Sequence, residues 1–253
     1  MTRSPGMHCF FKVHECFMTT NAIDYFNSQS PLRGLASRIA LHACRNIYAR
    51  FVTLAGAEPG RRLLDLGVTP DTSLPDSNFL ERWYPHCVDI TMASVEDCTA
   101  LEAVFPGTKF VWIQPDNALP FPDAYFDVGF CSAVLEHVGR AAQQRFLVQE
   151  LLRTCRSVFL TTPDRAFPIE VHTFLPILHW LPKDLHRRLL RWLGHSFWAA
   201  EANLNLLTRR ELAQLVAAVL QATRRSAPWS ISHHRLLGFS SNLILWIPAE
   251  ASV

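Results

Sequence analysis

The sequence has no long uninterrupted run of apolar residues and no strong charge of either sign. None of its runs reaches the ~18 apolar residues that a membrane-spanning helix requires. The formal net charge is +2, so no global field favours nucleic acid as a partner. The first residues, 1–21, also lack the continuous apolar segment of a signal peptide, because charged residues interrupt it. We therefore expect a cytoplasmic protein.

Paired cysteines and a complete set of metal ligands are also lacking. The seven cysteines include no CxxC pair and their number is odd, which favours reduced and mostly buried thiols. His172 and His179 are spaced to share one face of a helix, but Pro176 lies between them. Neither an acid nor a cysteine near this pair completes a zinc site, so we expect no metal centre.

What the sequence does contain is an alternation of short apolar segments with helical patterns. Residues 31–56 predict a helix that begins at a proline and carries a broad apolar face. A second long helical pattern covers 141–155, and a third covers 207–220, where Thr208 and Glu211 predict a capping box. Strands are predicted within 62–67, 86–97, 108–123, 125–138 and 157–163, the third of them running into a proline-rich loop, and two more close the chain within 229–249.

This alternation predicts an α/β fold with a doubly wound, mostly parallel sheet of seven strands. We expect residues 1–30 to form an N-terminal tail and 31–253 to form the single domain. The pattern changes after the fifth strand, where about 164–206 is rich in aromatic, basic and proline residues. We interpret this segment as a helical cap insertion. Ligands of such sheets bind beyond the carboxyl ends of the strands, so residues that follow each strand are the candidates for a site.

The first predicted strand ends in LLDLGVTPD, residues 63–71, where the expected glycines are missing after Gly67. A dinucleotide-binding loop needs several glycines so that its backbone can approach a pyrophosphate. Val68, Thr69 and Pro70 would crowd that approach, and Pro70 also removes an amide donor. The loop therefore disfavours a pyrophosphate ligand such as NAD and favours S-adenosylmethionine, a nucleoside whose tail is an amino acid.

Acidic residues follow the second and third predicted strands, where a nucleoside would lie. A carboxylate after the second strand can accept hydrogen bonds from both ribose hydroxyls, and Glu96 is the first candidate there, ahead of Asp97 and Asp89. Asp116 is placed to accept from the adenine amino group, and the backbone of Asn117 to contact a ring nitrogen.

Three segments together resemble the class I S-adenosylmethionine-dependent methyltransferases, in particular the broad type 11 group that includes ubiquinone-biosynthesis-like enzymes. They are RLLDLGVTPD, DNALPFPDAYFDVGFCSAVLEHVG and VFLTTPDRAFPIEVHTFLPILHWLP. The resemblance covers residues 60–165 best, and the first loop departs from the glycine-rich form of the family. It implies a Rossmann-like methyltransferase in which Asp65, Gly67 and Thr69 lie near the methionine tail of the cofactor. Ser132 and the segment Leu135–His137 would lie under the sulfonium and face the acceptor.

Methyl transfer from a sulfonium depends mainly on positioning, and a hydroxyl acceptor also benefits from a general base. His137 is the first choice for that base, because a histidine titrates near neutral pH. As alternatives, His137 could be a structural residue bonded to a backbone carbonyl, and Glu136 could cap or pair with a basic neighbour. The other candidates on the acceptor side are Glu136, Asp164, Glu170 and His172.

The leading hypothesis is therefore a methyltransferase that acts at oxygen on a small-molecule, glycan or lipid-like acceptor rather than on nucleic acid. The alternative is a methyltransferase fold that binds the cofactor without turnover. Residues 176–198 are basic and rich in tryptophan. They predict either a cap over the site or a surface that contacts a membrane peripherally. The sequence leaves the acceptor and the oligomeric state open.

Overall fold

A computed structural model describes residues 31–250, with side chains from residue 39 onward. The N-terminal tail predicted for 1–30 lies outside the described residues. The chain divides into two compact units, residues 1–40 and 41–253. Of the first unit only the helical backbone of residues 31–40 is described, and it belongs to helix α2, Pro31–Ala55. All other described elements belong to the second unit.

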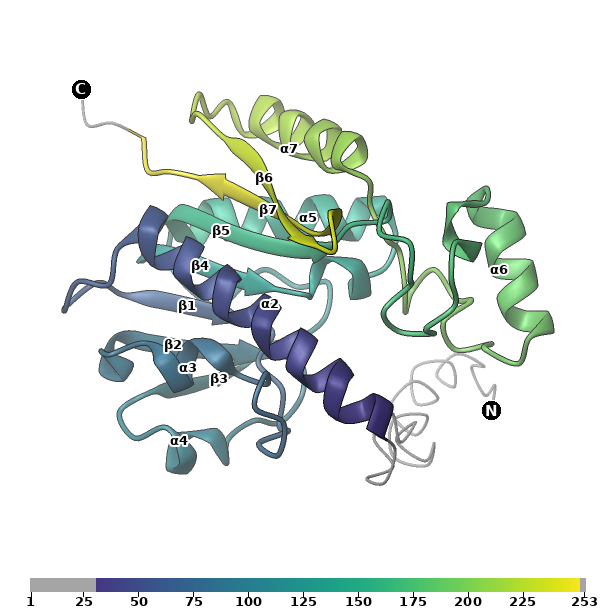
Figure 1. Cartoon of the computed structure of the whole chain (residues 1–253). Helices are drawn as coiled ribbons and strands as arrows, with labels where there is room; N and C mark the ends of the chain where they lie inside the picture. Colours follow the sequence, from purple (N-terminus) through teal and green to yellow (C-terminus); the bar gives the residue numbers. More distant parts are fainter. Residues whose placement is uncertain (1–30, 251–253) are drawn as a thin grey trace, which may run out of the picture. The chain divides into compact units, whose positions relative to one another are not determined.

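The second unit is built on one seven-stranded sheet (Figure 1). Its strand order is β3-β2-β1-β4-β5-β7-β6, and only β7 runs antiparallel to its neighbours. This arrangement is the Rossmann-like sheet of the methyltransferases, and it confirms the predicted fold class. The strands are β1 (Leu63–Leu66), β2 (Ile90–Ser94), β3 (Lys109–Trp112), β4 (Phe126–Ser132), β5 (Cys155–Pro163), β6 (Ser230–Leu236) and β7 (Phe239–Ile247).

The direction of winding reverses between β1 and β4, which pair in parallel at the centre of the sheet. The carboxyl ends of neighbouring strands diverge at such a switch point and leave room for a ligand. Residues that follow β1, β2, β3 and β4 therefore meet at one edge. Asp89, considered for that edge, instead ends a 3-10 turn that precedes β2 (η1, Cys87–Asp89), so it lies at the opposite end of the strand.

Helices cover both faces of the sheet, and each face has its own core. On one face, residues 41–55 of α2 pack with α3 (Phe79–Trp83) and α4 (Leu101–Val104), and the buried Phe51 contacts Phe130 and Phe159 edge-on. On the other face, α5 (Ala141–Thr154) and α7 (Arg209–Thr223) pack on the sheet through leucines and valines. The capping box predicted for Thr208 and Glu211 is present at the start of α7.

Between β5 and α7 the chain leaves the sheet in a segment that contains two short helices, η3 (Leu178–Trp180) and α6 (Lys183–Trp192). Figure 1 shows α6 to one side of the sheet, joined to it by the loops that follow β5 and precede α7. Within residues 31–250 no helix combines the length and apolarity needed to cross a bilayer.

Candidate active site

The carboxyl end of β4 continues into a 3-10 turn, η2 (Leu135–His137), that presents two ionisable side chains. Glu136 is completely buried, whereas the side chain of His137 is 35% exposed. His137 Nδ1 donates a hydrogen bond to the carbonyl of Asn203 at 2.8 Å. Because a carbonyl can only accept, this bond fixes the ring orientation and leaves Nε2 of a neutral His137 as the acceptor nitrogen.

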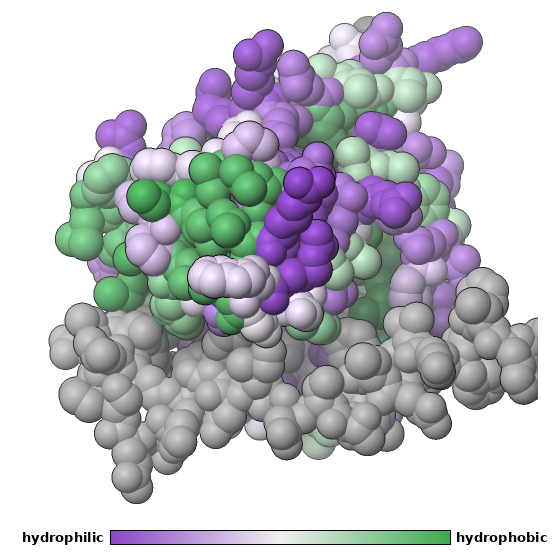
Figure 2. Space-filling view, turned by 90° about the vertical axis from the view of Figure 1, so that its right-hand side faces the viewer, coloured by the Kyte–Doolittle hydropathy of each residue, from purple (hydrophilic) through white to green (hydrophobic). Residues whose placement is uncertain are grey.

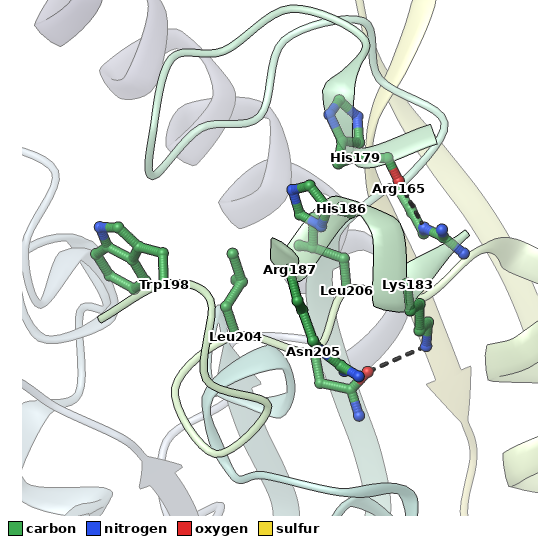
Figure 3. Close-up of a pocket in the computed structure, with 9 residues that line it drawn as sticks. All are labelled: Arg165, His179, Lys183, His186, Arg187, Trp198, Leu204, Asn205 and Leu206. Atoms are coloured by element: carbon green, nitrogen blue, oxygen red, sulfur yellow. Dashed lines mark hydrogen bonds between the residues drawn. The ribbon is translucent and has the colours of Figure 1, made fainter. Parts of the chain in front are cut away.

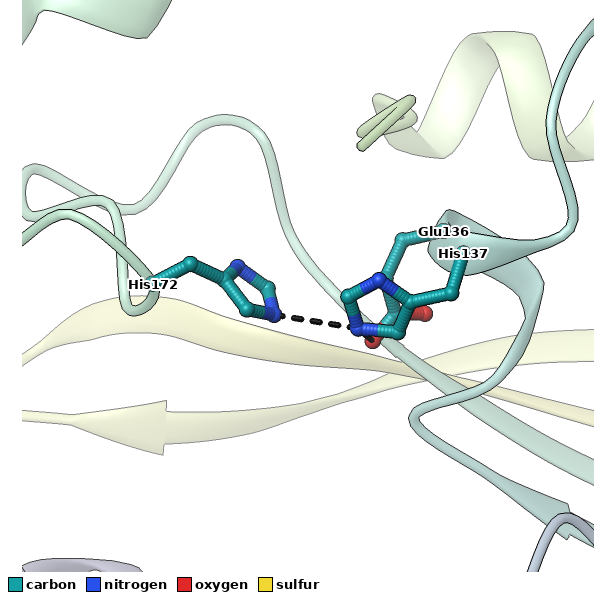
Figure 4. A group of neighbouring side chains, drawn as sticks. All are labelled: Glu136, His137 and His172. Atoms are coloured by element: carbon teal, nitrogen blue, oxygen red, sulfur yellow. Dashed lines mark hydrogen bonds and ion pairs between the residues drawn. The ribbon is translucent and has the colours of Figure 1, made fainter. Parts of the chain in front are cut away.

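That nitrogen faces a second histidine, which comes from the segment after β5 (Figure 4). His172 Nε2 lies 3.1 Å from His137 Nε2, and the two rings meet edge to face. His172 Nδ1 donates to the Glu170 carboxylate at 2.6 Å. Burial by itself raises the pKa of Glu170, but its hydrogen bonds and attraction to His172 and Thr173 outweigh this and lower that pKa to about 2. The carboxylate is therefore ionised and orients His172.

Glu136 is the third member of this cluster and contacts Thr162 and His137. Its Oε2 accepts a hydrogen bond from the hydroxyl of Thr162 at 2.9 Å, on the neighbouring strand. Its Oε1 is buried without a hydrogen-bond partner and lies 3.8 Å from His137 Nε2. A buried carboxylate oxygen without a donor is unfavourable, so this atom requires a positive partner from the two histidines or from a ligand.

Two buried amides hold η2 in place. Gln144 Nε2 donates to the carbonyls of Leu135 and Asn205, both at 3.0 Å. The backbone of Asn205 donates to the carbonyl of Glu136 at 2.8 Å, and its side chain donates to the carbonyl of Gly139. The stretch that ends in Asn205 is thus tied to η2, and this tie places the nearby Asn203 carbonyl against His137.

The acidic side chains expected to bind the nucleoside differ in whether they already make hydrogen bonds within the protein. Glu96 and Asp116 are exposed, and neither side chain makes a hydrogen bond or ion pair within residues 31–250. Asp97 is already used, because its Oδ1 accepts from the backbone and hydroxyl of Thr99. The amide of Asn117 makes only a long bond, 3.4 Å, to the carbonyl of Gln114. Glu96 and Asp116 are therefore the available acceptors at this edge.

The residues at the end of β1 are engaged with the protein itself. Thr69 donates its amide to Asn78 Oδ1 at 3.0 Å and its carbonyl accepts from the same side chain, so Asn78 holds the loop after β1. Asp65 is buried beneath α3, where burial and the neighbouring carboxyl of Glu81 raise its pKa. Its carboxyl group therefore lies against Glu81 inside the protein rather than at the surface of the loop.

Two further candidates also make structural contacts. Ser132 shares a hydrogen bond of 2.9 Å with Thr161 on the adjacent strand. Asp164 is buried, caps its own turn by accepting from the Ala166 amide, and lies 3.8 Å from His233 rather than near His137. Of the four acceptor-side candidates, the structure gathers Glu136, Glu170 and His172 around His137 and leaves Asp164 apart.

His179 does not share a helix face with His172, contrary to the spacing considered above. It lies in η3, where its Nε2 donates to the Phe167 carbonyl at 2.7 Å, whereas His172 lies in the preceding turn. His179 borders a small cavity of about 20 Å³ beside α6 (Figure 3). That volume suits a water molecule and no cofactor. Cationic residues around it are already paired, for example Lys183 with Asn205 and Glu211.

Comparisons with known proteins support a methyltransferase with a Rossmann-like fold. A family model described as a methyltransferase domain, of the type 11 group, matches residues 75–158. No match to a curated protein sequence was found. The matched stretch covers about a third of the chain, and over that stretch the chain is similar to a type 11 methyltransferase domain.

Solved structures share the fold at low sequence identity. Magnesium protoporphyrin IX methyltransferase from Synechocystis, solved with bound SAH, aligns with a TM-score of 0.53 and 11% identity, over 89% of this chain and 91% of that one. An S-adenosylmethionine-dependent methyltransferase from Mesorhizobium loti aligns with a TM-score of 0.51 and 15% identity, over 85% and 99%. The Pnkp1/Rnl/Hen1 RNA repair complex aligns with a TM-score of 0.50 and 15% identity. The alignment covers 82% of this chain but only 41% of that chain.

S-adenosylmethionine is the cofactor of this class, and the donor set at the sheet edge fits it. Ribose hydroxyls and an adenine amino group need hydrogen-bond acceptors, and the exposed carboxylates of Glu96 and Asp116 are acceptors of that kind. These two positions were predicted from strand ends alone, and their role toward the cofactor stays a prediction. The sequence missed Asn203 and Asn205, because only their contacts with η2 give them a role, and no motif indicates such contacts.

Proposed function

We propose that this methyltransferase acts on an oxygen atom of a small-molecule, glycan or lipid-like acceptor that binds above His137. The observation that supports this most is the hydrogen bond from His137 Nδ1 to the Asn203 carbonyl, 2.8 Å long. It leaves Nε2, on a side chain that is 35% exposed, as the nitrogen that can take a proton from an acceptor hydroxyl. S-adenosylmethionine supplies the electrophilic methyl group, and the chain orients the acceptor and removes its proton.

The roles of the remaining residues follow from their places at the edge of the sheet. Glu96 and Asp116 would bind the ribose and the adenine, with the backbone of Asn117 beside the purine ring. Gly67 and Thr69 would border the methionine tail. His172, held by Glu170, would keep the ring of His137 in position from the opposite side.

Binding of S-adenosylhomocysteine, measured by isothermal titration calorimetry, tests the cofactor half of this proposal. Glu96→Ala and Asp116→Ala should each weaken binding by about 1–3 kcal/mol, the effect of a lost hydrogen bond to a charged group. Glu58→Ala is the matched control, because it removes an exposed acid at the amino-terminal end of β1. Equal affinities in all three variants would show that the nucleoside does not lie along these strand ends.

Turnover tests the catalytic half. His137→Ala should leave cofactor affinity unchanged and slow methyl transfer by about 10²–10⁴-fold, the usual contribution of a general base. The assay uses methyl-labelled cofactor with an extract of small metabolites, and identifies labelled products by mass spectrometry. RNA serves as the comparison acceptor. A protein that binds the cofactor but labels nothing with either acceptor would fit the alternative, a methyltransferase fold without turnover.

A lipid-like acceptor has separate support from the segment of 176–198. Trp192 is 82% exposed, and Ile177 and Trp180 are also more than half exposed, although they are large and apolar. Figure 2, which views the molecule from the side that bears α6, shows hydrophobic and hydrophilic surfaces adjoining there. An amphipathic, basic surface of this kind can rest on a bilayer and bring the site to a lipid.

A further inference from the structure

In the cluster of Glu136, His137 and His172, several lone pairs face one another, and the neighbouring residues donate no hydrogen bond to them. His137 uses its Nδ1 hydrogen on the Asn203 carbonyl. His172 uses its Nδ1 hydrogen on Glu170, whose carboxylate also accepts from the amide and hydroxyl of Thr173. Both partners are acceptors, so each ring carries a hydrogen on Nδ1. When both rings are neutral, two Nε2 lone pairs face each other across 3.1 Å.

The third donor is the buried Oε1 of Glu136. This oxygen has no hydrogen-bond partner, its residue is 0% exposed, and it is 3.8 Å from His137 Nε2. All three donor atoms lie within 4.8 Å of one another. Two lone pairs and a carboxylate oxygen at these distances repel each other unless a cation lies between them, and that cation is either one shared proton or a metal ion.

From this juxtaposition we propose that Glu136, His137 and His172 bind one divalent first-row transition-metal ion, of the kind represented by Zn²⁺ or Co²⁺. Two imidazoles and one carboxylate form the donor set that such ions prefer. Metal bonds of about 2.0–2.1 Å place neighbouring ligand atoms roughly 2.9–3.4 Å apart, and the two nitrogens already meet this spacing.

The surroundings have the form of an outer shell around a metal. The hydrogen bond from His172 to Glu170 and that from His137 to a backbone carbonyl fix which nitrogen of each ring faces the cluster. Glu136 is fixed in the same way by the hydroxyl of Thr162. Such bonds orient metal ligands and make imidazole a better donor. Three protein ligands leave coordination positions open on the exposed side of His137.

Metal binding goes beyond the proposed function, because it requires neither cofactor nor acceptor. A bound metal would occupy the Nε2 lone pair assigned above to the proton of the acceptor. The metal-loaded and metal-free forms would therefore handle that proton differently, so the metal content of a preparation should be set before its activity is compared with that of another.

The test uses the full chain, stripped with a chelator and then freed of it. Titration with CoCl₂ should give visible absorption bands that saturate at one ion per chain, and calorimetry with ZnCl₂ should give the same stoichiometry. Glu136→Gln keeps the shape of the side chain and its acceptor for Thr162, yet removes the charged ligand, and should weaken binding at least ten-fold. Glu170→Gln, which acts only through His172, should weaken it by about 10–100-fold.

His195→Ala is the matched control, since it removes an imidazole whose side chain takes no part in the cluster, and it should bind cobalt like the wild type. Circular dichroism verifies that each variant is folded, and His172→Gln replaces any variant that is not. Absence of saturable binding in the wild type, or equal affinity in Glu136→Gln and His195→Ala, would overturn the site and leave the histidines sharing a proton only. Binding of S-adenosylhomocysteine in the same samples separates this result from the cofactor half of the proposed function, because the cofactor analogue and the metal ion are titrated independently.

Discussion

Gly67, at the end of β1, has one role suggested by the sequence and another shown by the structure. In the sequence it is the one glycine in a loop that should contain several. In the structure its φ is 103°, and a Cβ added at this position would clash with Cγ2 of Val134. The close approach of β1 to the end of β4 therefore requires glycine here for packing, whether or not a ligand is bound.

We expect Gly67→Ala to lower the free energy of unfolding by about 1–3 kcal/mol, measured by urea denaturation, because the added methyl group overpacks the switch point. Gly60→Ala is the comparison, since Gly60 also has a positive φ, 80°, but a methyl group there would meet no atom within 4 Å beyond its chain neighbours. Val134→Ala should recover part of the loss when combined with Gly67→Ala. A Gly67 variant no less stable than the Gly60 variant would mean that the contact with Val134 relaxes without cost.

At the scale of elements, one arginine of α5 holds the loop that follows Asp116. Arg153 donates to the carbonyls of Leu119 and Phe121, each at 2.8 Å, and to the Glu150 carboxylate at 2.6 Å. Burial raises the pKa of Glu150, but the hydrogen bonds from Arg153 and from the Leu119 amide leave it below its usual range. The proline-rich loop is therefore attached to α5 by charge-assisted hydrogen bonds rather than by a strand.

Arg153→Met should destabilise the fold by about 1–3 kcal/mol at pH 7, because it leaves the buried Glu150 without its cationic partner. The lowered pKa means that the pair stabilises the protein above the ordinary pKa of a glutamate. That contribution is lost as the pH falls through the folded-state value. The difference in unfolding free energy from the wild type should therefore shrink in acid. Arg145→Met, in the exposed part of the same helix, is the control; a difference that stays constant with pH would argue against the ion pair.

At the scale of the whole molecule, the segment between β5 and α7 does two things. Its first part carries Glu170 and His172 to the end of β4, and its last part brings Asn203 and Asn205 to η2. The stretch between them contains α6 and the exposed tryptophans. Any surface that α6 contacts is thus connected directly to the cluster around His137 through the backbone on both sides.

If that surface is a membrane, the protein should sediment with vesicles that contain anionic lipid and less with neutral ones, and salt should weaken the binding. Replacement of the exposed Trp192 and Leu193 by serine should reduce sedimentation. Val88→Ser, at an exposed apolar position before β2, is the control. Sedimentation equal to that of the wild type in the double variant would leave α6 with the role of a cap.

The strands and helices could be predicted from the sequence because their signals are local. Apolar segments of strand length alternate with helical patterns, and this alternation determines a parallel sheet. The capping box at Thr208 depends on residues three positions apart, and it is present. Glu96 and Asp116 could be predicted to share one edge because residues after parallel strands lie there, whatever the rest of the fold does. Their contact with a nucleoside stays a prediction.

The sequence by itself thus determined the sheet and its cofactor class. Only the tertiary structure decided that His172, 35 positions from His137, faces it across 3.1 Å with a buried Glu136 beside them. The reason is that this contact depends on the path of the loop after β5 and on hydrogen bonds from Asn205 and Gln144. The spacing of residues along the sequence contains no information about either. The same holds for Gly67, whose neighbour Val134 belongs to another strand's end.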